Sequence, residues 1–234
     1  MVKLTTVGFD ADDTLWHNER FYRLTQERFA ELLAPYTNAD RLIERLQTSE
    51  RRNLGHYGFG IKGFVLSMIE TAVDVTGGRV PGHVIGTLLE VGQEMLNHPI
   101  DLLPHAEEVV REVAATYRIV LVTKGDLLHQ ERKLARSGLG DFFDAVEIVS
   151  DKTTPVYARI FDTHGAGAAN AAMVGNSMRS DVLPVIKAGG WGIHVPQELT
   201  WTYEMLNAPR SEPRFREIAD LSALPALLRD IAHD

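Results

Sequence analysis

The first part of the chain predicts one short strand followed by a block of helices. Residues 3–9 (KLTTVGF) are a β-prone run that ends at Asp10. From about residue 18 onward, apolar residues recur with the spacing of one helix face, and no convincing strand occurs between Trp16 and His98. The pattern predicts helices at about 18–34, 39–54, 61–76 and 81–97. We therefore expect an all-helical block inserted directly after the first strand.

After Pro99 the pattern changes to strands that alternate with helices. Short, mostly unbroken apolar runs predict strands, and helical patterns separate them. The expected strands are 118–122, 145–149, 171–174 and 191–195, and the expected helices are 104–116, 126–137, 154–163, 179–188 and 222–232. The segment 196–216 contains three prolines and is expected to be irregular. This alternation predicts a parallel sheet with helices on both faces.

These elements define the expected fold class and domain organisation. The fold is α/β, with a doubly wound, Rossmann-like parallel-sheet core formed by residues 1–15 and 99–234. An all-helical cap domain, residues 16–98, is inserted into that core. A chain of 234 residues has the length of one core with one insert. The pattern carries no signal for an oligomeric state.

Composition and charge narrow the function classes. Acidic residues outnumber basic ones by 32 to 24, which gives a formal net charge of −8. This balance argues against a nucleic acid or an anionic membrane as a partner, because both favour clustered Lys and Arg. The chain has no cysteine, which excludes disulfides, thiolate zinc sites and cysteine nucleophiles. No apolar run approaches the roughly 20 residues of a membrane span, and no signal-peptide pattern is present, so we expect a cytoplasmic protein.

Polar residues follow four of the predicted strands, at the point where each strand ends. These segments are 10–14, 123–125, 150–152 and 175–181. In a doubly wound sheet, ligands bind at the carboxyl ends of the strands. We therefore expect these four segments to meet at one edge of the sheet.

The residue types at this edge suit the transfer of a phosphoryl group. A carboxylate such as Asp10 could attack phosphorus, and Asp12 could protonate the leaving oxygen and then deprotonate water. The Thr123 hydroxyl and the following backbone N–H groups could hold phosphate oxygens, while Lys152 could neutralise charge. Acidic or amide oxygens from residues 175–181 would complete a site for Mg²⁺, which prefers oxygen ligands.

Four motifs in this order resemble those of the haloacid dehalogenase superfamily, specifically its phosphatase branch with a helical cap of the first type. The sequence DADDT at 10–14 is similar to the first motif, Asp-x-Asp-x-Thr after an apolar strand. Thr123 after the apolar run IVLV is similar to the second motif, and Lys152 before TTP is similar to the third. The segment 175–181 (GNSMRSD) is similar to the fourth in spacing. The resemblance covers essentially the whole chain.

The resemblance implies a Mg²⁺-dependent phosphatase that hydrolyses a small phosphorylated metabolite through an aspartyl-phosphate. Asp10 would be the nucleophile, with its other oxygen on Mg²⁺. Asp12 would be the general acid and base, with its backbone carbonyl on Mg²⁺. Thr123 and the amide of Lys124 would hold phosphate oxygens, and Lys152 would stabilise Asp10 and the transferring group.

The fourth motif departs from the family pattern at Asn176. The family's usual motif begins Gly-Asp, whereas this chain has Gly175-Asn176. An Asn oxygen can still ligate Mg²⁺, but one negative charge is lost. Either Asn176 is the metal ligand, or Asp181 binds the metal directly or through water and Asn176 orients it.

Other functions stay open as alternatives: a phosphomutase or a dehalogenase of the same superfamily, or a non-catalytic protein that binds a phosphorylated metabolite. Dehalogenases of the family look like Asp-x-Tyr or similar in the first motif. A halide leaves without needing a proton, whereas an alkoxide needs one. The second acid, Asp12, therefore favours phosphoester hydrolysis.

Two features of the helical block invite a functional interpretation. The sequence GFGIKG at 58–63 matches Gly-x-Gly-x-x-Gly, but it follows no predicted strand, so we expect a turn between helices instead of a nucleotide site. Basic and aromatic residues cluster around this turn, at Arg51, Arg52, His56, Tyr57 and Lys62. They either meet an anionic substrate or form a solvated helix face beside Glu44 and Glu50.

Overall fold

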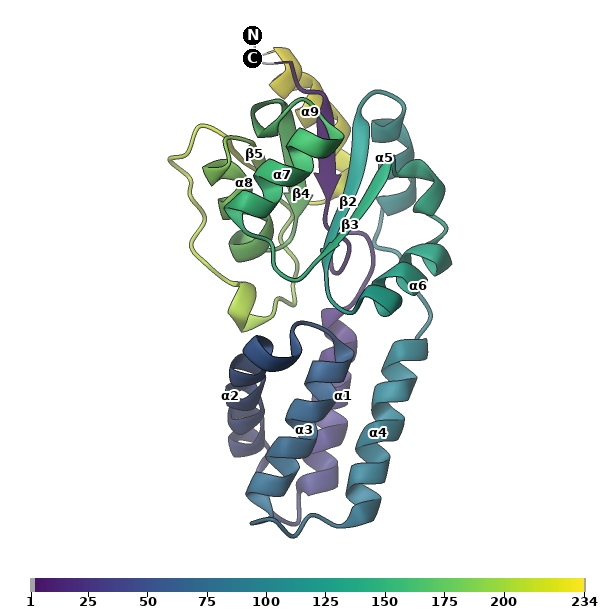
Figure 1. Cartoon of the computed structure of the whole chain (residues 1–234), viewed down its shortest axis with the longest axis vertical. Helices are drawn as coiled ribbons and strands as arrows, with labels where there is room; N and C mark the ends of the chain where they lie inside the picture. The colour runs from purple at the N-terminus through teal and green to yellow at the C-terminus, as the bar shows by residue number, and fades with distance from the viewer. Residues whose placement is uncertain (1–2, 234) are drawn as a thin grey trace. The chain divides into compact units, whose positions relative to one another are not determined.

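The chain divides into two compact units, which are drawn in Figure 1. The computed structural model describes residues 3–233. The α/β unit comprises the residues up to Glu19, Ile100–Lys124 and the residues from Gln130 onward. The helical unit comprises Arg20–Pro99 and Gly125–His129.

The α/β unit is built on a parallel sheet that, within residues 3–233, has six strands in the order β3-β2-β1-β4-β5-β6. The sequence order of the strands reverses at β1, which pairs with β2 on one side and β4 on the other. The predicted doubly wound parallel sheet is therefore confirmed. The strands are β1 (Thr6–Phe9), β2 (Arg118–Lys124), β3 (Ala145–Val149), β4 (Ala171–Gly175), β5 (Trp191–His194) and β6 (Phe215–Glu217).

Helices cover both faces of this sheet (Figure 1). Phe9 and Leu121 belong to a buried apolar cluster with α5 and α9, whereas Val120 and Val122 belong to a second cluster with α7 and α8. Neighbouring residues of β2 face opposite sides of the sheet and both sides are buried, which is why the middle of the strand, residues 119–122 (IVLV), is an unbroken apolar run. The helices are α5 (Ala106–Ala114), α6 (Leu127–Ser137), α7 (Thr154–His164), α8 (Leu183–Lys187) and α9 (Leu224–His233).

The helical unit has four long helices, and residues 20–99 contain no strand. Its core is a separate apolar cluster that includes Phe29, Leu46 and Met68, each almost fully buried. The side chain of Asn38 accepts a hydrogen bond from the backbone N–H of Arg41 at 2.9 Å and so caps the second helix. The helices are α1 (Glu19–Leu33), α2 (Ala39–Tyr57), α3 (Ile61–Val75) and α4 (Gly82–Asn97).

Two local predictions differ from the structure. The segment 196–216 was expected to be irregular, but Phe215–Glu217 forms the edge strand β6, which pairs with β5 through Gly192 and Phe215. A single helix was expected at 179–188, but a π-helical turn at Met178–Val182 precedes α8. A three-residue strand is too short to show a period, and a π-turn shifts the helical spacing at the place where the chain leaves the sheet.

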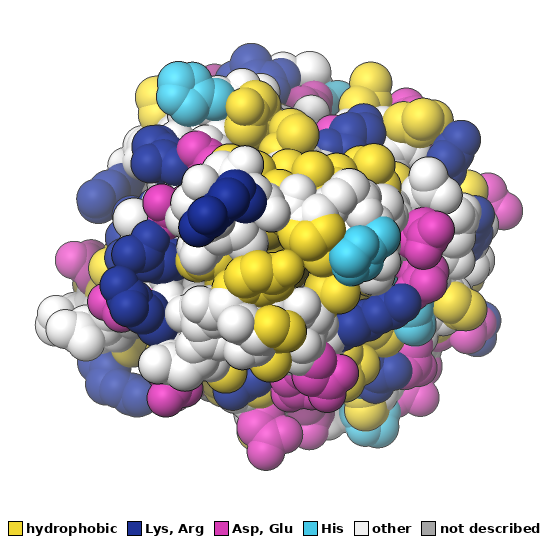
Figure 2. All heavy atoms as spheres, turned by 90° about the horizontal axis from the view of Figure 1, so that it is seen from below, with side chains coloured by type: hydrophobic (Ala, Val, Ile, Leu, Met, Phe, Trp, Pro, Cys, Tyr) yellow, Lys and Arg dark blue, Asp and Glu magenta, His cyan; other side chains and the backbone are white. Residues whose placement is uncertain are grey.

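One face of the molecule has mixed character. Figure 2 shows one face of the molecule, on which basic, acidic and apolar side chains are interspersed. None of the helices within the described residues is both long and apolar enough to span a bilayer.

Candidate active site

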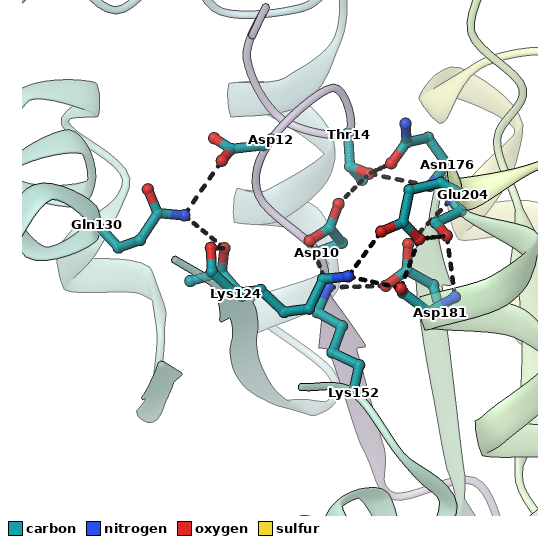
Figure 3. Close-up of polar contacts among 12 residues, drawn as sticks. Asp10, Asp12, Thr14, Lys124, Gln130, Lys152, Asn176, Asp181 and Glu204 are labelled. Carbon is teal, nitrogen blue, oxygen red and sulfur yellow. Dashed lines mark hydrogen bonds and ion pairs between the residues drawn. The ribbon is translucent and has the colours of Figure 1, made fainter. Parts of the chain in front are cut away.

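The register of the sheet brings the ends of β1, β2 and β4 together. Phe9, the last residue of β1, pairs with Leu121 of β2 and with Val174 of β4. The backbone N–H of Asp10 donates to the carbonyl of Val174 at 2.9 Å. Asp10 therefore emerges between the ends of the two neighbouring strands, and Figure 3 shows the polar side chains that meet there.

Asp10 lies against Lys152, which follows β3. The Lys152 Nζ atom donates to Asp10 Oδ1 at 2.5 Å and to Asp181 Oδ1 at 2.7 Å. The exposed fractions of the three side chains are 9% for Asp10, 2% for Lys152 and 1% for Asp181. Three groups that are far apart in the sequence thus form one buried cluster of charges.

Burial and the neighbouring charges shift the pKa values in this cluster. Burial raises the pKa of Asp10 to about 7, the negative charge of Asp181 adds to the increase, and Lys152 opposes it. Burial alone would lower the pKa of Lys152, but Asp10 and Asp181 together raise it above its usual range. Lys152 is therefore a permanent positive charge beside Asp10.

Asp181 is fixed by the turn that follows β4. Its Oδ2 atom accepts the backbone N–H of Ser177 at 3.0 Å, while Oδ1 accepts from Lys152. A Cβ atom at Gly175 would lie 2.3 Å from Asp181 Oδ2, so only glycine leaves room for this carboxylate. Both oxygens of Asp181 are thus engaged by the protein, which makes Asp181 the group that holds Lys152 in place.

Asn176 lies on the other side of Asp10, next to Thr14. The Thr14 hydroxyl donates to Asp10 Oδ2 at 3.0 Å and accepts the backbone N–H of Asn176 at 3.1 Å. It also lies 3.5 Å from Asn176 Oδ1. The side-chain oxygens of Asp10 and Asn176 therefore sit beside the same hydroxyl (Figure 3).

The side-chain oxygens of Asp10 and Asn176 suit Mg²⁺, although only one of the two residues is a carboxylate. Within residues 3–233, no group of three or more His, Cys, Asp or Glu side chains is arranged to hold a metal ion. Mg²⁺ binds through one or two carboxylates, other oxygens and several waters. The Asp10 carboxylate and the Asn176 amide oxygen, which lie beside the same Thr14 hydroxyl, are compatible with that chemistry.

Asp12 has partners that the sequence analysis did not identify. Its carboxylate accepts hydrogen bonds from Lys133 Nζ at 2.6 Å, from Trp16 Nε1 at 2.6 Å and from Gln130 Nε2 at 3.2 Å. Burial would raise the pKa of Asp12, but Lys133 above all, together with the other donors, lowers it below the usual range. The sequence did contain a signal for this contact. Lys133 lies on the buried face of the helix expected at 126–137, where a charged group needs a partner.

Gln130 also reaches Thr123. Its Nε2 atom donates to the Thr123 hydroxyl oxygen at 2.6 Å, and Thr123 is 2% exposed. One amide of α6 thus joins the end of β2 to Asp12. Lys124 points elsewhere, because its Nζ atom binds Ser180 and Glu204.

The third aspartate of DADDT, Asp13, has a local structural task. Its carboxylate accepts the backbone N–H groups of Asn18 and Glu19 at 2.8–3.0 Å, where the first helix begins. Asp13 is also one of two non-glycine residues with positive φ within residues 3–233, at 57°. Asp13 therefore stabilises the start of the first helix, whereas Asp10 and Asp12 belong to the polar cluster of the candidate site.

In the helical unit, the charges near the turn at 58–63 are largely paired. Arg52 binds Glu70 at 2.5 Å, and Lys62 binds Asp126 at 3.1 Å. Gly60 has a φ of 125°, and a Cβ there would lie 2.8 Å from Asp126 Oδ2. The first three residues of GFGIKG, 58–60, form the predicted turn between α2 and α3, and the last three begin α3. The element directly before this turn is the helix α2 and not a strand.

The fold and the buried Asp–Lys–Asp cluster define a doubly wound α/β protein with its polar site at the switch point of the sheet. A family model for haloacid dehalogenase-like hydrolases matches residues 4–189. The chain therefore belongs to the haloacid dehalogenase-like hydrolases and is a hydrolase.

Three known proteins illustrate the similarity. A haloacid dehalogenase-like family hydrolase from Xanthomonas campestris has 41% identity and a TM-score of 0.88, over 98% of this chain and 92% of that chain. The glyceraldehyde 3-phosphate phosphatase of Methanothermobacter thermautotrophicus is 26% identical over 210 residues, which are 84% of this chain and 88% of that protein. The 2-haloacid dehalogenase of Pseudomonas syringae has 20% identity and a TM-score of 0.60, over 97% of this chain and 99% of that chain, and it shares the fold.

Proposed function

We propose that this hydrolase is a phosphatase that acts on a small phosphorylated metabolite through an aspartyl-phosphate on Asp10. The observation that carries the proposal is the pair of carboxylates at the end of β1. Asp10 binds Lys152, while Asp12 has its own donors, Lys133 and Gln130. Two carboxylates in different surroundings suit a nucleophile and a proton-transfer group.

In the first step, the Asp10 carboxylate attacks phosphorus while the bond from phosphorus to the leaving oxygen breaks. Lys152 neutralises charge on Asp10 and on the transferring group, and Asp181 holds Lys152 there. The Thr123 hydroxyl and the amide of Lys124 hold phosphate oxygens. Asp12 gives its proton to the leaving oxygen, which departs as an alcohol.

In the second step, Asp12 removes a proton from water, and the water oxygen attacks phosphorus. The bond between phosphorus and Asp10 breaks, which releases inorganic phosphate and restores the carboxylate. The lowered pKa of Asp12 favours its ionised form, which accepts this proton. Asp12 must therefore hold a proton, taken from the water of the preceding turnover or from solvent, before it acts in the first step. Lys133 therefore sets the balance between the acid and the base form of Asp12.

Mg²⁺ is the metal that we propose for this site. Asp10, the backbone carbonyl of Asp12 and Asn176 would hold it, and Asp181 would act through Lys152, to which its Oδ1 atom is bonded. When bound, Mg²⁺ supplies positive charge that offsets the charge of the phosphate and of Asp10.

The fold does not separate a phosphatase from a dehalogenase, because the dehalogenase from Pseudomonas syringae shares it. Asp12 supports the phosphatase, since a leaving alkoxide needs a proton and a halide does not. The similarity to a glyceraldehyde 3-phosphate phosphatase supports the same class and a small substrate. We propose that residues 16–98 act as the cap domain that selects this substrate.

The test is phosphate release from p-nitrophenyl phosphate and from a panel of phosphorylated metabolites, with Mg²⁺ and with EDTA. Asp10→Asn should lower kcat by roughly a thousandfold or more, because the nucleophile is lost. The matched control is Asp162→Asn, which makes the same change at an exposed position on α7 and should retain activity. Halide release from haloacids without phosphate release, or an active Asp10→Asn variant, would refute the proposal.

A further inference from the structure

An ion pair that the proposed mechanism does not use lies at the edge of the site. Lys124 Nζ binds Glu204 Oε1 at 2.7 Å, and the two side chains are only 11% and 12% exposed. Lys124 ends β2, directly after Thr123, whereas Glu204 belongs to the short helical turn Thr202–Glu204. A nearly buried ion pair thus joins the end of a central strand to the long segment that follows β5.

Glu204 also binds the turn that carries Asn176 and Asp181. Its Oε2 atom accepts the hydroxyls of Ser177 and Ser180, both at 2.5 Å, and the Ser180 hydroxyl oxygen accepts from Lys124 at 2.8 Å. Burial would raise the pKa of Glu204, but Lys124 and these hydroxyls lower it below the usual range. Glu204 is therefore an ionised carboxylate with every oxygen in use (Figure 3).

Most of the residues around Glu204 contribute little buried surface. Thr202, Met205, Leu206 and Asn207 around it are exposed, with Met205 at 58%. The neighbouring anchor is polar as well: Arg179 Nε donates to the Tyr203 carbonyl at 2.6 Å. Trp201 and Tyr203 are half-buried and contact each other, and Arg179 lies over the Tyr203 ring. Glu204 is the residue of this stretch whose side chain binds Lys124.

We propose that Glu204 is a positioning residue that holds the Lys124 ammonium at Ser180. The phosphate is then bound by the backbone amide of Lys124 and not by its ammonium. The inference rests on the proposed phosphatase function. Lys124 follows Thr123, and a nearly buried ammonium without a carboxylate partner would pair with another anion. The anions within the site are Asp10, Asp181 and the phosphate product.

The variant Glu204→Gln tests this directly, because it keeps the shape and removes the charge. Released from Glu204, the ammonium should bind phosphate, so inhibition by orthophosphate should tighten by about tenfold and kcat should fall as product release slows. The matched control, Glu198→Gln, removes a charge from an exposed position of the same segment and should match the wild-type protein in both quantities. Glu204→Asp should keep most of the wild-type behaviour.

The double variant Lys124→Met/Glu204→Gln separates positioning from a structural role. If Glu204 acts through the Lys124 charge, removing both groups should return orthophosphate inhibition to the wild-type strength or weaker and recover part of kcat. If Glu204→Gln has wild-type inhibition by orthophosphate, or if the double variant is as strongly inhibited as Glu204→Gln, the proposal is wrong.

A failure of the proposed function would look different. The wild-type protein would then release no phosphate from any phosphomonoester. Coupling between Lys124 and Glu204 would still be measured by thermal unfolding of the two single variants and the double variant. Additive losses of stability in those variants would overturn the positioning role independently of any activity.

Discussion

Asp10 and Asp12 are two residues apart, yet their surroundings shift their pKa values in opposite directions. Burial and Asp181 raise the pKa of Asp10 to about 7, whereas Lys133 keeps that of Asp12 below its usual range in spite of burial. The sequence predicted both aspartates as site residues. It did not predict Lys133 and Gln130 as partners of Asp12. A helical pattern shows which face of α6 is buried, but not which residues of the loop after β1 that face contacts.

Lys133→Met tests the control of Asp12 at the residue scale. Without the Lys133 charge the pKa of Asp12 should rise, so that its base form is populated only at higher pH. The acid limb of the kcat profile, which includes hydrolysis of the phosphoenzyme, should therefore move to higher pH. We also expect a loss of about 1–3 kcal/mol in the free energy of unfolding, because the carboxylate keeps fewer donors.

The control for Lys133→Met is Arg132→Met, which removes a positive charge from an exposed position of the same helix. Its pH profile should match that of the wild-type protein. An acid limb that stays in place in Lys133→Met would show that Asp12 does not govern it.

At the scale of elements, the strands and the long helices followed from periodicity, and the exceptions have local causes. Strand β6 has three residues, and the π-helical turn before α8 begins where Ser177 caps the chain by accepting the N–H of Ser180 at 2.9 Å.

In α2, the alternative of a solvated face beside Glu50 is only partly right. The Glu50 Oε2 atom is buried and has no hydrogen-bond partner among the described residues, and Arg52 binds Glu70.

Glu50→Gln should stabilise the helical unit at neutral and alkaline pH. Burial raises the pKa of Glu50 from 4.5 to about 7, so between these values the folded chain holds a proton that the unfolded chain has lost. Stability therefore falls as pH rises through this window, and the full cost is present above about pH 7. The substitution should raise the free energy of unfolding by about 1–3 kcal/mol at pH 8 and have little effect at pH 4.

Denaturant unfolding at the two pH values measures the effect of Glu50→Gln. Glu44→Gln provides the control, since Glu44 is an exposed acid on the same helix. Equal stabilisation at pH 4 and pH 8, or none at either, would contradict the assignment of the cost to the buried Glu50 carboxylate.

At the scale of the whole molecule, a site made of distant segments was predictable because the ends of parallel strands must meet at one edge of a sheet. Asp10, Thr123, Lys152 and Asn176 could be placed together from the strand pattern alone. Glu204 could not, because it lies in a segment without periodicity, and its position depends on Lys124, Ser177 and Ser180. The cap role of residues 16–98 stays a prediction.

The central claim is that Asp10 carries the phosphoryl group during turnover. The most direct measurement is to mix the protein with a phosphorylated substrate and Mg²⁺, quench with acid during the steady state, and map the peptides by mass spectrometry. With p-nitrophenyl phosphate, whose leaving group departs without needing a proton, Asp12→Ala should raise the occupancy of the intermediate, because water loses its base. The account predicts a phosphoryl group on Asp10 that hydroxylamine removes. Phosphate release with Asp10 unmodified throughout, or with the phosphoryl group on another residue, would contradict it.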